Sequence, residues 1–329
     1  MRKTVLLLVL LLATFIVPMV FESCAGMPPD VTQPPDVTQA PSSPSNQNGE
    51  GPRIVYVDCY VLSIAKLDMA TGEFTADFYL YFSSDRCSER GIVSDFEFCN
   101  GNANRKDDYF PDMQTYDFYR IEAVLHNNLD LSRYPFDRHE ITIALEDKYE
   151  FEEAMIYEVA KIYPPRDPLL QIPGWEIEGD DRKAVIYEYP WGKVSRFIYT
   201  MNIRRPVVTG FLKTILPALI MVMVGLLSLQ FSPDKYIARL TLITGALTGT
   251  VILHLNINSS LPPLGYLTLA DRFMLFNYLA LALSLITTLV IISYGDRNKT
   301  TAVMWISRWS LVVVPTLWVG LQLLNFFVW

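Results

Sequence analysis

The pattern of apolar and polar positions divides the chain into two parts with different periods. After residue 53 apolar residues alternate with polar ones in short runs, which is typical of β-strands with one buried face. After residue 204 they form long continuous runs, each long enough to cross a membrane as a helix. We therefore expect an all-β sandwich over residues 53–204, followed by an all-α transmembrane domain over residues 205–329. The expected strands are residues 53–64, 74–82, 119–127, 140–146, 175–179, 184–189 and 196–203, with a short helical turn near 152–157.

The second part contains four apolar spans joined by short loops. Lys235 and Arg239 follow the first span, and Arg297 and Lys299 follow the third, whereas residues 259–270 carry no basic residue. Because basic residues concentrate on the cytoplasmic side, we expect a multi-pass protein of the cell (inner) membrane with its β-domain and C-terminus outside. The four expected helices are residues 207–229, 233–258, 273–294 and 305–328.

The second span is more polar than the others, and its polar residues share one side of the expected helix. Ser232 is a favourable N-cap and Pro233 suits the first helical position, so we expect the helix to begin there. At about 100° per residue, a stripe within about 60° of Thr241 is polar at both ends and apolar at Ile252 and Leu255. Several copies around an axis would expose this stripe to water; the alternative is that its Thr and Gly residues only mediate helix packing. The stripe residues are Asp234, Thr241, Thr244, Gly245, Thr248, Ile252, Leu255, Asn256 and Ser259.

The N-terminal region predicts export of the β-domain. Arg2 and Lys3 precede an apolar run, the arrangement of a secretory signal peptide, which we assign to residues 1–25. Residues 26–52 are rich in Pro, Ser, Asn and Gly and predict a disordered linker.

The four cysteines leave two questions open. Cys24 lies near the expected cleavage site, but the residues before it match a lipidation signal poorly. Cys87 and Cys99 either pair in an oxidising compartment or remain unpaired small core residues.

Charge also separates the two parts. Residues 53–203 contain 28 Asp and Glu against 16 Lys and Arg, a net charge of −12, whereas residues 204–329 contain 3 against 9, a net charge of +6. This division favours an acidic domain in water and a domain in lipid, and we expect no nucleic-acid partner.

Residues that carry most catalytic and metal chemistry are few and scattered. His126, His139 and His254 show no metal-ligand spacing, and the spans contain no nucleophile–base pair. We therefore expect no enzymatic activity, no metal site and no cofactor.

Several motifs resemble those of one family. Residues 134–137, Tyr-Pro-Phe-Asp, lie about 70 residues before the first span and resemble the signature of the Cys-loop receptor superfamily, the pentameric ligand-gated ion channels. The resemblance covers residues 53–329. Further motifs in the family's order are Gly174-Trp175, Arg204-Arg205-Pro206, Pro217 and Leu261-Pro262-Pro263.

The chain also departs from the family. No cysteines stand near Asn127 and Ile141, where the Cys-loop pair would fall; the connection between the third and fourth helices is only about eight residues; and no N-terminal helix precedes the sandwich. These three features resemble the prokaryotic branch. Thr248 stands where the family usually has Leu in the middle of the stripe, so we expect the hydrophobic gate at Ile252 and Leu255 instead.

The resemblance implies a homopentamer around a central pore in the lipid bilayer, lined by the stripe of the second span. An agonist would bind between adjacent sandwiches, and the signal would pass to the membrane through Asp68, Asp137, Arg205 and Pro263. Residues 187–193 resemble the capping loop of the family's site, where aromatic rings can hold a cation. The expected ligand-binding residues are Tyr79, Phe98, Tyr187, Tyr189 and Trp191, unless these are core or rim residues.

The agonist class stays open between a small molecule and protons, with divalent cations as modulators. We expect cation selectivity, because five acidic domains would surround the entrance and five copies of Asp234 would ring the cytoplasmic mouth. By the same helical count Lys235 and Arg239 point about 120° and 160° away from the stripe, toward lipid headgroups or a neighbouring Asp234. The alternative function is a non-conducting, membrane-anchored binding or sensor protein of the same fold.

Overall fold

The computed structural model describes residues 51–84, 86, 92, 95–109 and 116–327, which fall into two compact units. The sandwich unit holds the described residues of Pro28–Asp130 and Arg138–Arg204. The helical unit holds Leu131–Asp137 together with the described residues of Arg205–Trp329. The expected signal peptide, with Cys24, nearly all of the linker and Cys87 lie outside the described residues.

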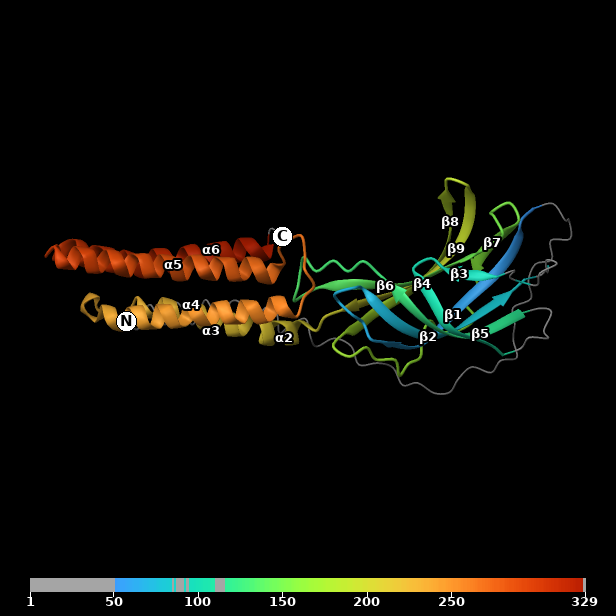
Figure 1. Cartoon of the computed structure of the whole chain (residues 1–329), viewed down its shortest axis with the longest axis horizontal. Helices are drawn as coiled ribbons and strands as arrows, with labels where there is room; N and C mark the ends of the chain where they lie inside the picture. The colour runs from blue at the N-terminus through green and yellow to red at the C-terminus, as the bar shows by residue number, and fades with distance from the viewer. Residues whose placement is uncertain (1–50, 85, 87–91, 93–94, 110–115, 328–329) are drawn as a thin grey trace. The chain divides into compact units, whose positions relative to one another are not determined.

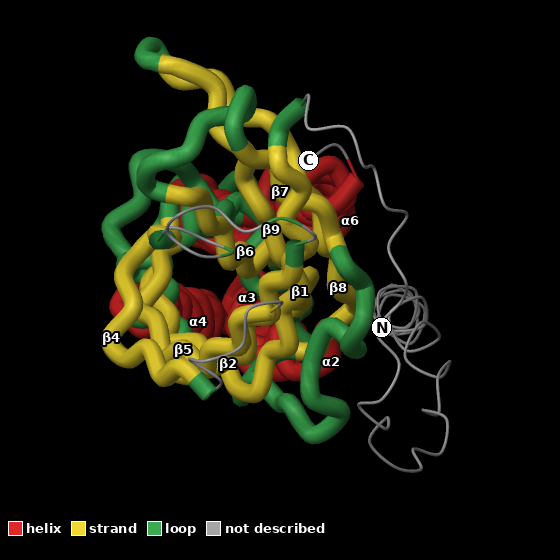
Figure 2. The backbone as a smooth tube through the Cα atoms, turned by 90° about the vertical axis from the view of Figure 1, so that its right-hand side faces the viewer, coloured by secondary structure: helices red, strands yellow, loops and turns green. Residues whose placement is uncertain are grey.

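The sandwich unit consists of two sheets, whose strands are yellow in Figure 2. The five-stranded sheet has the order β4-β5-β2-β1-β7, and the four-stranded sheet has the order β3-β6-β9-β8. Neighbouring strands are antiparallel except for β1 and β7. The strands are β1 (Arg53–Ala65), β2 (Glu73–Ser83), β3 (Phe96–Phe98), β4 (Gly101–Asp108), β5 (Tyr116–His126), β6 (Arg138–Asp147), β7 (Met155–Val159), β8 (Glu176–Tyr189) and β9 (Gly192–Arg204).

Strand β2 shows how the sequence builds the core between these sheets. Its residues alternate between fully buried and half-buried, with Phe74, Phe78 and Phe82 among the buried ones. Phe78 packs edge-on against Phe98 and Phe82 packs against Phe96, with ring centroids 5.7 and 5.2 Å apart. Each fully buried side chain of this kind stabilises the fold by about 1.5–3 kcal/mol, so period-2 burial accounts for the pairing of the two sheets.

The structure differs from the predicted strands in three places. Residues 175–179 and 184–189 belong to one continuous strand, β8, with a bulge between Ile177 and Gly179 that interrupts the alternation. The helical turn expected near residues 152–157 is wrong in its second half: only residues 152–154 form a turn, and strand β7 begins at Met155. The parallel pairing of β7 with β1 is not visible in local sequence. Strands β3 and β4 were not predicted, because β4 is polar along its length and lacks an apolar period.

The helical unit contains four apolar spans that lie side by side (Figure 1). The first begins as α2 (Val207–Gly210), passes through a π-helical turn, η1 (Phe211–Ile215), and continues as α3 (Leu216–Ser228). The second consists of a 3₁₀ turn, η2 (Pro233–Lys235), and α4 (Tyr236–Ser259). The third and fourth are α5 (Leu269–Asp296) and α6 (Thr300–Phe327).

The third and fourth helices begin earlier than their apolar runs. At α5, the Thr268 hydroxyl accepts a hydrogen bond from the Asp271 amide while Asp271 accepts one from the Thr268 amide, forming a capping box. This box places the helix start four residues before the predicted residue 273. Helix α6 starts at Thr300, two residues after Asn298, which has a positive φ of 55°. The first turns of these two helices therefore contain polar residues, which the apolar runs used to predict the helices leave out.

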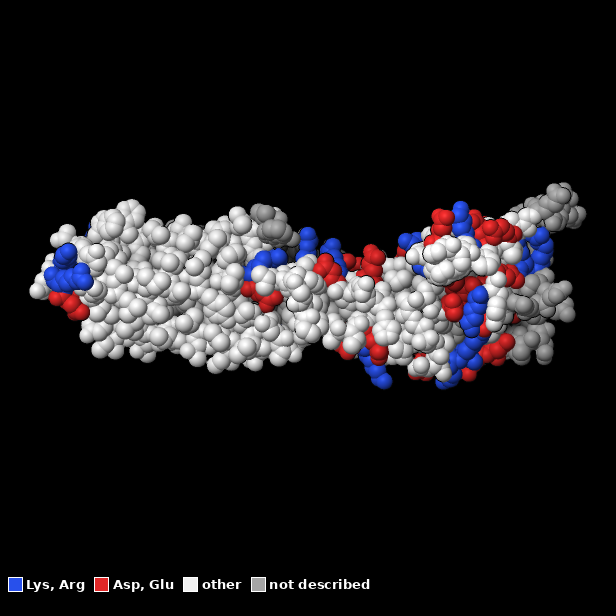
Figure 3. Space-filling view, turned by 45° about the horizontal axis from the view of Figure 1, so that its top comes forward, with Lys and Arg blue, Asp and Glu red and all other residues white. Residues whose placement is uncertain are grey.

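The surface of the helical unit changes character along the helices. In Figure 3 the face in view is almost entirely free of Lys, Arg, Asp and Glu along the helices, with charged groups at their ends. Such a band suits the hydrocarbon core of a membrane. Polar groups inside the unit pair with one another: the Trp318 indole donates to Asn277 Oδ1 at 2.8 Å, and Arg272 Nε donates to Asn325 Oδ1 at 3.1 Å. Four helices of this length and composition are those of a multi-pass membrane protein.

Candidate functional site

Helix α4 has one exposed face along its length. From Thr241 onward the face is polar except at Val251, Ile252 and Leu255, which are 42 %, 55 % and 64 % exposed, and the first turn of the helix also exposes Tyr236 and Ile237. The exposed residues in the middle of α5, by contrast, are Leu275, Leu279, Ile286 and Leu289, as expected for a lipid-facing surface. The exposed faces of α4 and α5 thus differ in polarity, although both are exposed in the single chain. Its exposed residues include Thr241, Thr244, Gly245, Thr248, Ile252, Leu255, Asn256 and Ser259, the stripe predicted from sequence.

The two glycines of α4 have different surroundings. A Cβ added at Gly249 would lie 2.9 Å from the Met221 sulfur, so Gly249 allows α3 and α4 to pack closely. A Cβ added at Gly245 would meet no atom of the described residues within 4 Å. Within one chain, the packing explanation for small residues therefore applies to Gly249 and not to Gly245.

Threonine hydroxyls on the exposed face bond to their own helix. Thr241 Oγ1 donates to the Ile237 carbonyl at 2.9 Å, and Thr244 Oγ1 donates to the Leu240 carbonyl at 2.8 Å. Each hydroxyl keeps oxygen lone pairs for other partners. The face can therefore offer oxygen atoms to water or to a hydrated cation.

Arg239 lies on the opposite side of α4 and is fully buried. Its Nη2 donates to the carbonyls of Leu229 and Phe231 at 2.9 and 2.6 Å and to Ser307 Oγ at 2.9 Å. This cation therefore caps the C-terminal end of α3, where the helix dipole is negative. The expectation that Arg239 reaches lipid headgroups or a neighbouring Asp234 is wrong, because its side chain is fully buried among the helices of its own chain.

Asp234 does not lie on the α-helix as expected. Residues Pro233–Lys235 form the 3₁₀ turn η2, and Lys235 has φ −91° and ψ 38°, which breaks the regular count of 100° per residue. Ser232 makes no side-chain capping bond. Asp234 and Lys235 are both exposed, so the predicted angle of Asp234 carries no weight and its place at the mouth is supported by exposure alone.

The loop between β5 and β6 packs onto the helices. The carbonyls of Ser132 and Tyr134 accept hydrogen bonds from the amides of Leu269 and Ala270 at 2.8 and 3.1 Å. These amides belong to the first turn of α5, which has no partners inside its own helix. The Leu131 amide donates to the hydroxyl of Tyr266 at 3.0 Å. The Tyr-Pro-Phe-Asp loop is thus built into the N-terminus of α5.

Asp137 and Arg205 form a buried ion pair at the end of this loop. Arg205 Nε donates to Asp137 Oδ1 at 2.8 Å and Nη2 donates to Oδ2 at 3.1 Å, a bidentate geometry. The side chain of Asp137 is fully buried and that of Arg205 is 22 % exposed. Arg205 also lies 5.1 Å from the centre of the Tyr134 ring. The pair joins the loop to the start of the first span.

The other two predicted coupling residues have different surroundings. Asp68 is exposed, and its Oδ1 accepts the Ala70 amide at 2.7 Å, so it orders the turn between β1 and β2. In the same turn, Gly72 has φ +70°, and a Cβ there would lie 1.9 Å from the Asn127 carbonyl. Pro263 is exposed in the loop after α4.

An aromatic cluster lies at the end of the β8–β9 hairpin. The rings of Tyr189 and Trp191 stack at 4.8 Å with an interplanar angle of 8°, and Tyr187 meets Tyr189 edge-on at 4.8 Å. The Arg196 guanidinium lies 3.8 Å from the centre of the Tyr187 ring and donates to Glu146 Oε1 at 2.6 Å. We call these five residues the hairpin cluster. Its chemistry is a set of partly exposed ring faces around one internal ion pair.

A second aromatic group lies on the five-stranded sheet. Tyr79 stacks on Phe118 at 5.1 Å and meets Tyr109 edge-on at 5.9 Å. Beside it, Arg120 forms a bidentate ion pair with Asp77, at 3.1 and 2.7 Å. Burial and the neighbouring Tyr109 raise the pKa of Tyr79, which therefore stays a neutral hydrogen-bonding group.

Phe98 is not part of either exposed group. It lies in the sandwich core, packed against Phe78 and Phe96, so its assignment to ligand binding is wrong for this chain. The adjacent Cys99 is exposed instead, and it forms no disulfide with another cysteine of the described residues. Its sulfur is nevertheless partly buried, and this burial together with the nearby Glu146 carboxylate raises the pKa of Cys99 to about 12.

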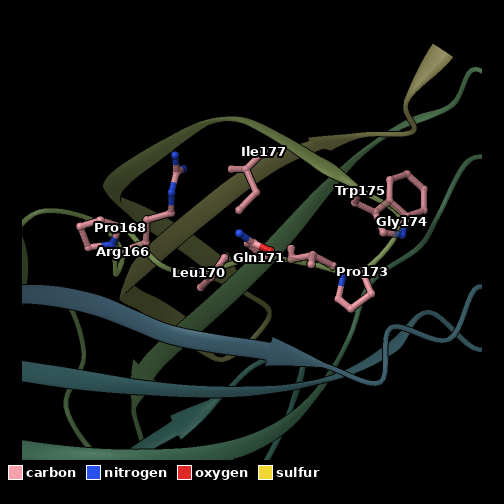
Figure 4. A pocket seen from close by; sticks show the side chains of 9 residues that line it. Arg166, Pro168, Leu170, Gln171, Pro173, Gly174, Trp175 and Ile177 are labelled. Carbon is pink, nitrogen blue, oxygen red and sulfur yellow. The ribbon is translucent and has the colours of Figure 1, made fainter. Parts of the chain in front are cut away.

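Two cavities were not anticipated from sequence. One, of about 560 Å³, lies in the segment between β7 and β8 and is lined by Arg166, Gln171 and Trp175 among others (Figure 4). The other, also of about 560 Å³, lies in the helical unit beside His254 and Pro263.

Comparison with known proteins gives two relatives of the same kind. They are the gamma-aminobutyric acid receptor subunits rho-2 of Bos taurus and of Homo sapiens, each 26% identical over 200 residues, which is 59% of this chain and 41% of the relative. No protein-family model matches the chain. The two-sheet domain followed by four apolar helices agrees with this relationship. The chain is a distant relative of the Cys-loop receptors.

The match spans less than half of the length of these receptor subunits. The predicted fold of Cys-loop receptors, a β-rich domain followed by four membrane helices, is confirmed. The sequence prediction missed the Glu146–Arg196 pair and the capping role of Arg239. A carboxylate and a guanidinium in two separate strands give no local signal, since only the register of β6 with β9 places them opposite each other.

Proposed function

We propose that the chain assembles as a homopentamer and forms a cation-selective ion channel, opened by an agonist that binds between adjacent sandwiches. Distant homology to receptor subunits supports a ligand-gated channel. The observation that carries the proposal is the exposed polar face of α4. No residue of the described chain covers it, and a polar face of this length is unfavourable in lipid.

Five copies of this face around an axis would line a water-filled pore. Oxygen atoms of Thr241, Thr244 and Thr248 would face the ion path, and Ile252 and Leu255 would form two adjacent apolar rings nearer the other end. Narrow apolar rings exclude water when closed, so these two positions are the proposed gate.

Selectivity for cations rests on two features. The net charge of −12 over residues 53–203 would give five acidic domains around the entrance and raise the local cation concentration. Arg239, which would oppose cations at the inner end, is buried against the α3 carbonyls and cannot face the ion path. Exposed Asp234 and Lys235 then set the charge at the mouth, and we assign the selective ring to Asp234.

The agonist site would form where the hairpin cluster of one copy meets the Tyr79 group of the next. The two groups lie on different sheets of one sandwich, so a ring of copies can bring them together. The agonist must bind the open state more tightly than the closed state to shift the equilibrium.

We place the sandwich and the C-terminus outside the cell membrane. This orientation puts the loop that carries Arg297 and Lys299 on the cytoplasmic side, where basic residues concentrate.

Reconstitution into liposomes tests the proposal directly. Purified protein should show five subunits by native mass spectrometry and should conduct ions across the bilayer. A monodisperse monomer or dimer without flux would instead support the non-conducting sensor protein.

Reversal potentials in asymmetric NaCl test selectivity. We expect reversal near the sodium equilibrium potential, and we expect Asp234→Asn to shift it toward zero while Lys235→Gln does not. Reversal near the chloride potential would overturn the assignment, and an Asp234→Asn channel with unchanged selectivity would move the selective element to the acidic domains.

A further inference from the structure

The ring of Tyr187 already has a cation against it, and that cation belongs to the chain. The Arg196 Cζ lies 3.8 Å from the centre of the Tyr187 ring and 5.9 Å from that of Tyr189. Arg196 Nη2 donates to the Tyr189 hydroxyl at 2.9 Å. A planar, weakly hydrated guanidinium in this position makes the same contact that an organic cation would make with the ring.

The charge of the hairpin cluster is balanced without a ligand. Glu146 is 5 % exposed and accepts hydrogen bonds from Arg196 Nε at 2.6 Å and from the Tyr189 hydroxyl at 3.2 Å. A second cation at Tyr187 would meet the guanidinium and find the carboxylate already paired. Like charges in a partly buried site repel, so the arrangement disfavours ammonium ligands.

We propose that Arg196 is a specificity-determining residue of the agonist site, and that the end of the ligand at Tyr187 carries a hydrogen-bond acceptor rather than an ammonium group. The inference rests on the proposed function for the identity of the site. Among the described residues, Nη1 of Arg196 has no hydrogen-bond acceptor, and its side chain is 15 % exposed. A hydrogen-bond acceptor on the ligand can bind this remaining N–H donor of the guanidinium group.

Two probes of equal shape separate charge from size. Choline carries a trimethylammonium group, and 3,3-dimethyl-1-butanol replaces it with a neutral tert-butyl group. Binding of each to the full-length protein in detergent is measured by titration calorimetry. We expect choline to bind wild type no more tightly than the neutral probe, and Arg196→Met to tighten choline binding by about tenfold or more, since the ring face and carboxylate become available. The neutral probe should change less than threefold.

Further variants keep the test decisive. The double variant Glu146→Gln/Arg196→Met removes both charges and leaves no buried carboxylate unpaired. Choline should still bind this double variant more tightly than it binds wild type, through contact with the rings. Adding Tyr187→Leu to the double variant should remove that gain in affinity. Arg204→Met is the matched control, because it removes an ion-paired guanidinium from the same strand. Equal choline affinity in wild type and both Arg196 variants would overturn the proposal.

The readout is independent of conduction. A chain that fails to pass ions can still show the choline gain, and a conducting chain can fail to show it. Wild type that binds choline at least tenfold more tightly than the neutral probe would also overturn the proposal, since Arg196 would then not exclude cations.

Discussion

Removal of either partner of the Asp137–Arg205 ion pair should destabilise the helical unit, and the two single variants should differ. Arg205→Ala leaves a fully buried carboxylate without its bidentate donor, so we expect a cost near the upper end of the range for breaking a buried pair, about 3–5 kcal/mol. Asp137→Ala leaves a guanidinium that is 22 % exposed and rests near the Tyr134 ring, so solvent and the ring offset part of the loss. We expect a cost at or below the lower end of that range.

The assay is a double-mutant cycle on the full-length protein. The midpoint of thermal unfolding in detergent is measured for wild type, both single variants and the double variant. The double variant should lose less stability than the sum of the two single losses, by about 1–3 kcal/mol, because neither charge is left alone. Arg138→Ala is the control: its pairing with Glu178 at 3.4 Å is largely exposed, with the arginine side chain 69 % exposed, and should contribute below about 1 kcal/mol.

Purely additive losses in this cycle would refute the pair as an energetic unit. Equal losses for the two single variants would refute the burial argument, which depends on Asp137 being more buried than Arg205. If the pair also transmits gating, both single variants should raise the agonist concentration needed for half-maximal current.

Three further predictions concern the pore, the buried Arg239 and the thiol of Cys99. Ile252→Ser should raise the resting conductance or lower the agonist concentration for half-maximal current, since it wets an apolar ring; unchanged values for both would exclude Ile252 from the gate. Arg239→Met should lower the thermal midpoint because the carbonyls at the end of α3 lose a buried donor, at a cost of about 1–3 kcal/mol, whereas Arg308→Met, an exposed residue of α6, should change it little. The pKa of Cys99 is raised to about 12, and only the thiolate reacts, so Cys99 should react with iodoacetamide at pH 8 more slowly than an ordinary thiol. The reaction rate should keep rising up to about pH 12. A plateau of the rate near pH 9 would show an ordinary thiol pKa.

The sequence alone determined the division of the chain and the class of each part. Four continuous apolar spans predict four membrane helices however they pack together. In lipid, backbone N–H and C=O groups have no water to bond, and a helix pairs them within one segment. Apolar and polar residues alternate in β2 and β9, and this alternation determines which face of each strand is buried. A shift of the strand pairing by one residue would turn the apolar side chains to the opposite face. The stripe on α4 could also be found in advance, because helical periodicity within one element needs no tertiary information.

Tertiary structure decided whatever depends on residues far apart in sequence. The carbonyls of Ser132 and Tyr134 cap α5 about 135 residues later, and Arg239 caps the end of α3 through a side chain whose direction depends on how two helices pack. Phe98 and Tyr79 are both aromatic residues of strands, yet only the pairing of the sheets buries the first and leaves the second at the surface. The Arg196 guanidinium reaches the Tyr187 ring because the register of β8 with β9 sets Val185, two positions away on the same face, opposite Arg196. Local sequence specifies period and hydrophobicity, whereas cross-strand register and helix contacts select which polar groups meet, and those contacts exist only in the folded chain.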